Sequence, residues 1–300
     1  MKILCFGSLN IDYTYRVDHF VGKGETLSAD SLQIFSGGKG LNQAIALVNA
    51  GADTYMAGSI GEDGLFLLKQ LEAAGVHTEH VRVLTQERTG NAITQNDREG
   101  DNCILLYGGA NRAITREQVD RVLADFLPGD YLILQNEINE MPYIMETAHA
   151  RGLKVVLNPS PMEYCILEFP LEYVDYLILN EVEAVQLLRE KIIRTGEELS
   201  IALQERFPGT AVVLTLGEQG SVYRDENEVI VQPVFSVQTV DTTAAGDTFT
   251  GFFIAGITRG QSVKEAMELA AKAAAIAVTR PGASPSIPLL SEVKENIFVL

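Results

Sequence analysis

Short apolar segments alternate with longer amphipathic segments along most of the chain. The apolar segments have the length of strands, and they are Ile3–Gly7, Thr54–Gly58, Tyr131–Gln135, Val155–Asn158, Tyr176–Leu179 and Val212–Leu216. They show little alternation of apolar and polar residues, which is typical of strands buried on both faces of a parallel sheet. The pattern predicts an α/β fold with a doubly wound, mostly parallel central sheet and helices on both faces.

Helical periodicity occupies the segments between these strands. The clearest predicted helices are Leu41–Ala50, Leu65–Ala74, Met141–Arg151 and Val263–Thr279. A glycine follows each of the first three, at Gly51, Gly75 and Gly152. Glycine at this position favours a left-handed residue that ends a helix.

Two segments interrupt this rhythm, Asp12–Ser36 and Glu87–Tyr107. Both are rich in Thr, Tyr, Val, Asn and Gly, and the second contains the turn-like sequence DREGDN between two strand-like arms. We expect one α/β domain over residues 1–300, with a small antiparallel β lid inserted from about 12–36 and 87–107. The alternative is that the two segments are elaborated loops rather than a lid.

The composition is that of a soluble globular protein, with 46% hydrophobic and 21% charged residues. Apolar runs stay shorter than the roughly 18 residues of a membrane span, and the first residues lack the apolar core of a signal peptide. The three cysteines have no metal-like spacing, which favours reduced thiols and a cytoplasmic location.

The formal net charge of −17 argues against a nucleic-acid partner, since phosphate backbones are bound by clustered Lys and Arg. The four histidines are scattered, so a zinc site or a histidine-based triad is not expected. An anionic ligand would have to be held by local devices: a helix N-terminus, a bound cation or one well-placed lysine.

A glycine cluster, SGGKGLNQA, opens the first predicted helix at Ser36–Ala44. Gly40 follows Lys39 where a P-loop needs Ser or Thr, and Gln43 stands where a dinucleotide fingerprint needs Gly or Ala. Closely approachable backbone, one cation at Lys39 and the amide of Asn42 suit a polyhydroxyl ligand. A purely structural glycine turn explains the segment equally well.

Polar residues follow several predicted strands, where ligands of open parallel sheets bind. Asn10 and Asp12 follow the first strand, Glu137 follows LILQN, and Asn180 and Glu183 follow LIL. Carboxylates there can accept sugar hydroxyls or act near a nucleotide through Mg²⁺. Helix capping is the structural alternative. The sequence LTLGEQGSV predicts a tight hairpin.

The segment VDTTAAGDTFTGFF, Val240–Phe253, places Asp247 at the start of an apolar helix. Ala244, Ala245 and Gly246 are small residues that would leave backbone N–H groups open to an anion. A base that deprotonates an alcohol beside a transferring phosphoryl group suits Asp247. Asp241, with carbonyls from Thr279–Ser286, could hold a cation behind this anion hole. Favourable placement in the helix dipole is the structural alternative.

These motifs together resemble the ribokinase branch of the PfkB carbohydrate kinases. The resemblance runs through GSLNID, SGGKGLNQA, LNPSP, LNEVEA, LTLGEQG, DTTAAGDTFTG and AAIAVTRPGASPS. It implies a kinase that transfers the γ-phosphoryl group of MgATP to the 5-hydroxyl of ribose and is activated by K⁺. It also implies a β lid that pairs two subunits.

The resemblance assigns roles residue by residue. Asp247 matches the catalytic base, and Ala244, Ala245 and Gly246 match the anion hole. The sugar-binding positions are Asn10, Asp12, Gly38, Lys39, Asn42 and Glu137. The nucleotide-binding positions are Asn180, Thr215, Gly217, Gly220 and Gly246, with Glu183 associated with Mg²⁺. The monovalent-cation positions are Asp241, Thr243, Ala277, Arg280, Gly282 and Ser286, most of them through backbone carbonyls.

We therefore expect an ATP-dependent kinase that forms ribose 5-phosphate, acting on a small-molecule sugar with no nucleic-acid or membrane partner. Leu41 replaces the small residue usual in this glycine motif, and the lid carries Gln95 and Asn96 where apolar residues are common. Deoxyribose, another furanose or a nucleoside thus stays open as the acceptor. A sugar-binding regulator without turnover is an alternative from another class.

Overall fold

The computed structural model describes residues 1–190 and 195–296. Within them the central sheet has nine strands in the order β13-β12-β11-β10-β9-β8-β1-β4-β5. Their bounds are β1 Ile3–Phe6, β4 Thr54–Gly61, β5 His77–Leu84, β8 Tyr131–Gln135, β9 Lys154–Asn158, β10 Tyr176–Asn180, β11 Ala211–Thr215, β12 Ser221–Arg224 and β13 Val229–Gln232. Pairing is parallel from β5 to β11 and antiparallel only at β12 and β13, which confirms the mostly parallel sheet.

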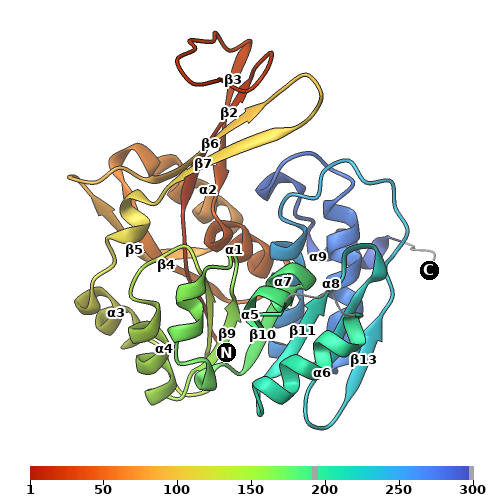
Figure 1. The fold of residues 1–300 in the computed structure, drawn as a ribbon. Coiled ribbons are helices and arrows are strands. Elements are labelled where there is room, and N and C mark those ends of the chain that lie inside the picture. The colour runs from red at the N-terminus through yellow and green to blue at the C-terminus, as the bar shows by residue number, and fades with distance from the viewer. Residues whose placement is uncertain (191–194, 297–300) are drawn as a thin grey trace.

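Helices cover both faces of this sheet (Figure 1), as predicted. Their bounds are α1 Lys39–Asn49, α2 Leu65–Ala74, α3 Arg116–Leu123, α4 Met141–Ala150, α5 Glu181–Leu187, α6 Gly196–Arg206, α7 Ala245–Thr258, α8 Val263–Ala277 and α9 Leu290–Glu295. None of the helices in the described residues is long and apolar enough to cross a membrane.

Each central strand contributes to two separate cores because successive side chains point to opposite faces. Ile3 and Cys5 of β1 join the core beneath α1, α2, α7, α8 and α9. Leu4 and Phe6 join the core beneath α3, α4, α5 and α6. Both faces are buried, which explains why the strands read as continuous apolar runs rather than alternating ones.

The predicted helix ends are confirmed by the backbone. Gly51, Gly75 and Gly152 have φ values of 86°, 94° and 78°, in the left-handed region that glycine adopts without strain. The sequence LTLGEQGSV forms the predicted hairpin, in which β11 pairs antiparallel with β12 around a short 3₁₀ turn.

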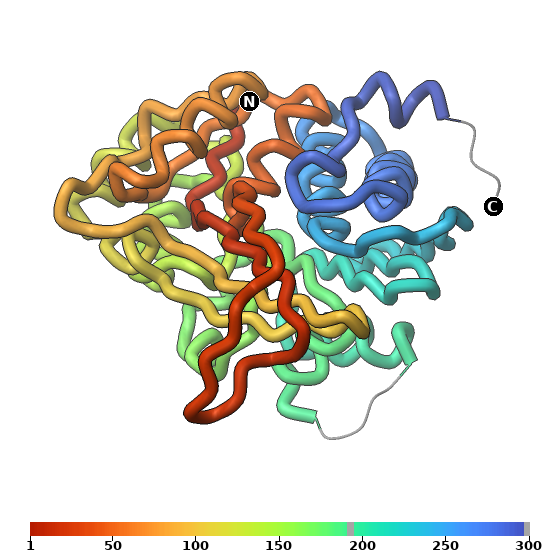
Figure 2. The backbone as a smooth tube through the Cα atoms, turned by 90° about the horizontal axis from the view of Figure 1, so that it is seen from above, coloured from red at the N-terminus to blue at the C-terminus, as the bar shows by residue number. Residues whose placement is uncertain are grey.

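A second sheet of four strands projects from the body (Figure 1). Its order is β3-β2-β6-β7, with β2 Asn10–Arg16, β3 Ser31–Gly37, β6 Gly90–Asn96 and β7 Asn102–Tyr107. Seen from above, its two hairpins lie against each other (Figure 2). The two hairpins are antiparallel as expected, but β2 pairs parallel with β6, so the prediction of a wholly antiparallel sheet is wrong. Since β2 and β6 both leave the body in the same direction, their pairing is parallel.

Helix α7 has an unbroken buried run from Asp247 to Gly256. It crosses α1 closely at Gly251, where an added Cβ would lie 2.4 Å from the Cβ of Ala46 and 2.9 Å from the backbone N of Leu47. Only glycine fits this approach, and the approach sets the distance between α1 and the first turn of α7.

Replacing Gly251 by Ala should therefore separate the two helices and destabilise the protein. We expect a loss of about 1–3 kcal/mol in the free energy of unfolding, despite the better helix propensity of Ala. Urea unfolding measures it. Gly22→Ala, at an exposed position where the nearest atom to an added Cβ is 3.4 Å away, is the control. Equal stability of the two variants would contradict the proposed close packing.

Candidate active site

Polar side chains from distant parts of the chain gather at the carboxyl ends of the parallel strands. Asn10 follows β1, Glu137 follows β8, and Asn158 and Asn180 end β9 and β10. Helix α7 starts at the same edge and brings Asp247 to α1. The structure thus brings together the predicted sugar-binding residues and the predicted base.

The glycine-rich segment packs against the backbone that follows β1. A Cβ at Gly40 would lie 2.5 Å from the N of Ser8, and one at Gly38, whose φ is +93°, would lie 2.9 Å from the Ser8 carbonyl oxygen. Both glycines are therefore required by packing alone. The structural reading of this turn holds, and its effect is to place the start of α1 directly over the end of β1.

Glu137 is bound to this start of α1. Its Oε2 accepts a hydrogen bond of 2.9 Å from the backbone N–H of Lys39 and another from the Ser8 hydroxyl. Ser8 is buried and was not singled out from the sequence. Glu137 is consequently a fixed acceptor at the strand edge.

Asp12 lies on β2 with a second carboxylate nearby. Burial, together with the negative charge of Glu137, raises the pKa of Asp12 to about 6. A Cβ at Gly37, its neighbour on β3, would lie 2.0 Å from the Asp12 carboxylate, so only glycine leaves room for this side chain. No hydrogen bond between Asp12 and any described side chain satisfies its carboxylate, which leaves both oxygens for a ligand.

Asn10 is oriented by a residue that sequence reasoning missed. The amide of Asn111, which is buried in the short turn after β7, donates 2.7 Å to the Asn10 Oδ1. Asn111 also accepts from the Leu9 N–H at 3.0 Å. The sequence GGANR around Asn111 carries no spacing that points to the first strand, so only the fold reveals this contact.

The charges of several predicted site residues act on Lys39. Burial alone would lower the pKa of Lys39, but the carboxylates of Asp247, Glu137 and Glu183 outweigh it and raise that pKa. The ammonium group therefore stays charged among residues assigned to the sugar, the base and the nucleotide. It balances negative charge at a point where several carboxylates converge.

Asp247 is 7% exposed, and both of its carboxylate oxygens are hydrogen-bonded. Oδ2 accepts from Asn42 Nδ2 at 3.0 Å, and Oδ1 accepts from Gln43 Nε2 at 2.9 Å. The Oδ1 of Asn42 is buried without a partner among the described residues. Favourable placement in the helix dipole does not require such dedicated donors, so the structure gives Asp247 more support than a helix-starting role needs.

The backbone before Asp247 is unusual. Ala244 adopts a left-handed conformation with φ 61°, which is strained for a residue other than glycine. In the part of the chain that the structure describes, no hydrogen bond uses the N–H groups of Ala244, Gly246 or Asp247, and an added Cβ at Gly246 meets no atom within 4 Å. The prediction of three open N–H groups at Ala244–Gly246 needs one correction, because the Ala245 N–H donates to the Thr242 carbonyl at 3.2 Å. The first turn folds back on itself there.

The predicted nucleotide residues occupy the next strands of the same edge. Asn180 and Glu183 form a reciprocal capping box at the start of α5, with bonds of 2.9 and 3.1 Å. Thr215 pairs with Asn180 across β10 and β11. At Gly220 an added Cβ would lie 2.1 Å from the Gln232 carbonyl, whereas at Gly217 it would meet nothing within 4 Å. Gly220 is therefore explained by the hairpin, while Gly217 leaves open space.

The predicted cation residues form a second cluster. Asp241 accepts from the N–H and hydroxyl of Thr243 at 2.9 and 2.6 Å and from the Gly282 N–H at 2.8 Å. These bonds hold the pKa of Asp241 low, although burial alone would raise it. The Arg280 guanidinium pairs with Glu292 at 2.7 Å, so Arg280 could face a cation only through its carbonyl. The Ala277 carbonyl accepts from the Arg280 N–H, and Ser286 is buried in the adjoining turn.

A profile of the pfkB family carbohydrate kinases matches residues 1–290. The chain belongs to the pfkB family of carbohydrate kinases. It is 34% identical to a ribokinase of Staphylococcus aureus over 98% of this chain and 99% of that protein. It is 28% identical to a deoxyribokinase of Salmonella typhi over 99% of both. The structure of Arabidopsis thaliana ribokinase complexed with ribose and ATP matches 98% of this chain and 97% of that one, with a TM-score of 0.88 and 31% identity.

Membership of the pfkB family makes this enzyme a phosphotransferase that acts on a sugar. The likeness to the Arabidopsis structure also confirms the ribokinase-like fold expected from the motifs. A buried carboxylate, a cluster of polar groups and open helix-terminal N–H groups lie together at one sheet edge, which is compatible with the chemistry of such a transfer.

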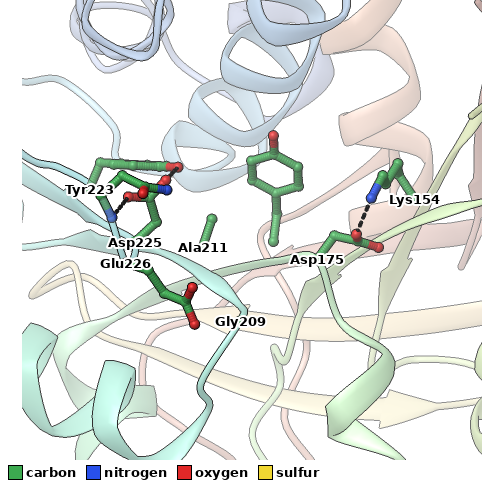
Figure 3. A pocket seen from close by; sticks show the side chains of 9 residues that line it. Lys154, Asp175, Gly209, Ala211, Tyr223, Asp225 and Glu226 are labelled. Carbon is green, nitrogen blue, oxygen red and sulfur yellow. Dashed lines mark hydrogen bonds and ion pairs between the residues drawn. The ribbon is translucent and has the colours of Figure 1, made fainter.

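A separate cavity of about 220 Å³ opens at the opposite, amino end of the strands (Figure 3). Lys154 and Asp175, 2.7 Å apart, line one side, and Tyr223 and Asp225 line the other, with their own hydrogen bond of 2.8 Å. Asp225 also accepts two backbone N–H bonds. These four side chains therefore have partners in the cavity wall, whereas the Asn42 Oδ1 beside Asp247 has none among the described residues.

The raised pKa of Asp12 predicts that this residue destabilises the ligand-free protein at neutral pH. Because its folded pKa is about 6 and the unfolded value is 3.8, the folded state binds the proton more tightly, and stability falls as pH rises from about 4 to 6. Asp12→Asn should then raise the unfolding free energy by roughly 1–2 kcal/mol at pH 7.5 and by less at pH 4.5. Thermal unfolding at both pH values measures this, with exposed Asp30→Asn as the control. A gain that is equal at both pH values would count against a buried, charged Asp12.

Proposed function

We propose that this enzyme transfers the γ-phosphoryl group of MgATP to the 5-hydroxyl of ribose, giving ribose 5-phosphate. The observation that carries the proposal is the contact of buried Asp247 with Asn42, on the same first turn as Lys39. It joins a basic oxygen to a cluster of sugar-sized polar groups. The ribokinase name of the relatives supports ribose as the acceptor.

The sugar would be bound by the polar groups around the start of α1. The proposed set is Asn10, Asp12, Gly38, Lys39, Asn42 and Glu137. Asp12 offers two free carboxylate oxygens, and Asn42 offers a buried Oδ1 without a partner in the described residues. An unpaired buried acceptor costs free energy, which a sugar hydroxyl would recover by donating to it.

Asp247 would then act as the general base. It would accept the proton of the 5-hydroxyl as that oxygen forms a bond to the γ-phosphorus and the bond from phosphorus to the bridging oxygen of ADP breaks. The open N–H groups of Ala244 and Gly246 would stabilise the negative charge that spreads over the transferring group. Ala245 would contribute once its bond to Thr242 is released.

ATP would lie along the carboxyl ends of β10 and β11. The proposed contacts are Asn180, Thr215, Gly217, Gly220 and Gly246. Mg²⁺ bound to the phosphates of ATP would neutralise part of their charge during transfer. Glu183 suits a role toward that ion because only one of its carboxylate oxygens serves the capping box, and its charge reaches Lys39.

Oxygen atoms alone make up the donor set proposed for the monovalent cation. K⁺ would be held, mostly through backbone carbonyls, by Asp241, Thr243, Ala277, Arg280, Gly282 and Ser286. Asp241 already links two of these segments by its hydrogen bonds to Thr243 and Gly282. A hard, weakly charged cation suits such a set. The bound ion would balance the Asp241 charge next to the anion hole.

The four-stranded sheet would be a lid over the sugar within a single domain. Asp12, Phe35, Ala92 and Leu106 are direct cross-strand neighbours and so share one face, which Asp12 turns toward the site. The opposite face carries Ile34, Tyr13, Ile93 and Leu105 in one apolar row across all four strands. We propose that this row pairs two subunits in a cytoplasmic homodimer.

Other acceptors are alternatives to ribose. Deoxyribose or another furanose would use the same base and the same carboxylates. A nucleoside would need room for its base beyond Asp12 and the lid. In a regulator that binds sugar without turnover, Asp247 would have no catalytic role. The two hydrogen bonds dedicated to the Asp247 carboxylate disfavour this alternative.

Ribose should be phosphorylated fastest among ribose, deoxyribose, fructose and adenosine, and K⁺ should raise the rate. Asp247→Asn should reduce kcat about 10²-fold or more because the amide cannot accept the proton. Coupled ADP release, run with and without K⁺, measures both effects. If Asp247→Asn were as active as the wild type, Asp247 would not be the general base. If no sugar were turned over, the sugar-binding regulator would be favoured.

The dimer predicts a second, independent result. Leu105 is 67% exposed on the outer apolar row, and Leu105→Asp should convert the dimer to a monomer because a charge would be buried in the interface. Light scattering measures the mass. Leu127→Asp, at a position 68% exposed in the loop after α3, is the matched control. A wild-type monomer, or a dimer that tolerates Leu105→Asp, would reject this interface.

A further inference from the structure

Gln43 lies against Asp247 but has no atom left for a substrate. Its side chain is fully buried. Its Nε2 donates to Asp247 Oδ1 at 2.9 Å and to Asn158 Oδ1 at 3.3 Å, and its Oε1 accepts from Gln135 Nε2 at 2.7 Å. Both N–H bonds and the carbonyl are thus used within the protein. Its neighbour Asn42 differs, since the Oδ1 of Asn42 has no partner among the described residues.

The orientations of the side-chain amides of Gln43, Gln135 and Asn158 follow from the Asp247 carboxylate. An ionised Asp247 can only accept, so the NH₂ group of Gln43 must face it. The Oε1 of Gln43 then faces Gln135, whose NH₂ group must donate. Asn158 presents its oxygen to Gln43 and its NH₂ group to the Ile178 carbonyl at 2.8 Å. This arrangement presents a donor to Asp247 and leaves one atom of the three amides, the Oε1 of Gln135, buried without a partner among the described residues.

These three amides connect Asp247 to neighbouring strands of the central sheet, β8, β9 and β10. Gln135 ends β8, Asn158 ends β9, and Ile178 lies in the middle of β10. Asp247 itself stands on α7, a different element, at a helix start that includes the strained Ala244. Without a link to the sheet, the carboxylate would depend only on Asn42, which the proposed function also assigns to the sugar.

We propose that Gln43 is a positioning residue for the phosphoryl transfer, fixing the rotamer of Asp247 from the sheet through Gln135 and Asn158. The inference rests on the proposed function of Asp247 as base. A base that is held in place reacts from the correct geometry. Gln43 therefore acts through Asp247 and does not touch the sugar.

The titratable groups whose charges act together with Asp247 are Lys39 on α1 and Cys5 on β1. Burial raises the pKa of the Cys5 thiol to about 12, with the charge of Asp247 contributing, so the thiol is neutral through the assay range. Lys39 is charged throughout the same range. Asp12 differs, because burial and the charge of Glu137 raise its pKa to about 6, so the kcat values of the Gln43 variants are compared at one pH above that value.

The test is Gln43→Met, which keeps the length of the side chain and removes its hydrogen bonds. At saturating ribose, kcat should fall roughly 10- to 100-fold, with KM for ribose changed less than threefold. Gln43→Glu, which places a second carboxylate beside Asp247 and removes the donor, should lower kcat at least as much.

The control is Gln118→Met. Gln118 is also a buried glutamine with three hydrogen bonds, to Gly58, Ser59 and Arg82, none of them in the candidate site. Its substitution should lower the unfolding temperature, while kcat and KM for ribose stay within about threefold of the wild-type values. Circular dichroism and thermal unfolding on all variants separate a folding defect from a positioning defect.

Two results would overturn the proposal while the wild type is active and Asp247→Asn is not. One is a kcat of Gln43→Met within about threefold of the wild-type value. The other is a large rise in KM for ribose with kcat intact, which would make Gln43 a sugar contact. If the wild type itself fails to turn over any sugar, or Asp247→Asn stays active, the proposed function fails instead.

Discussion

A carboxylate buried between two helices must be given hydrogen-bond donors, and this requirement organises the centre of the enzyme. Asp247 on α7 takes its donors from Asn42 and Gln43 on α1. The two helices can supply this contact only because Gly251 lets them approach at Ala46. Helix α1 is in turn fixed over the end of β1 by Gly38 and Gly40. Packing of small residues thus decides where the charged chemistry sits.

Most charged groups in the candidate site are carboxylates, although the nucleotide is also negatively charged. The chain has a net charge of −17, and the carboxylates of Glu137, Glu183 and Asp247 act on Lys39, with Asp12 close to Glu137. An anionic nucleotide therefore meets no basic surface. Under the proposed function, attraction would come from the open N–H groups at the start of α7, from one buried lysine and from cations that accompany the ligand. The carboxylates would then serve the sugar hydroxyls and the proton transfer.

Much of the fold could be predicted from the sequence, because buried strands and glycine-ended helices leave local patterns. The strand at Tyr131–Gln135 and the helix at Leu65–Ala74 were predicted with their observed bounds. The parallel pairing of β2 with β6 could not be predicted, since no local signal says in which direction the two lid segments leave the body.

The candidate site divides in the same way. Asp247, Lys39 and Glu137 lie in motifs or directly after strands, where sequence reasoning looks. Asn111 and Gln135 were missed because their roles depend only on partners about a hundred residues away. For Asn180 and Glu183 the capping alternative is what the structure contains, and their proposed nucleotide role is additional to it.

The contact between α1 and α7 also has a consequence for the way the chain folds. Asn42 and Asp247 are 205 residues apart in the sequence, so their pairing is among the slow, non-local steps of folding. During synthesis, the first half of the sheet can form long before α7 exists. Until α7 docks, the amides of Asn42 and Gln43 have no carboxylate to face. Under the proposed role of Asp247 as base, recovery of enzymatic activity on refolding would therefore report the docking of α7 on α1.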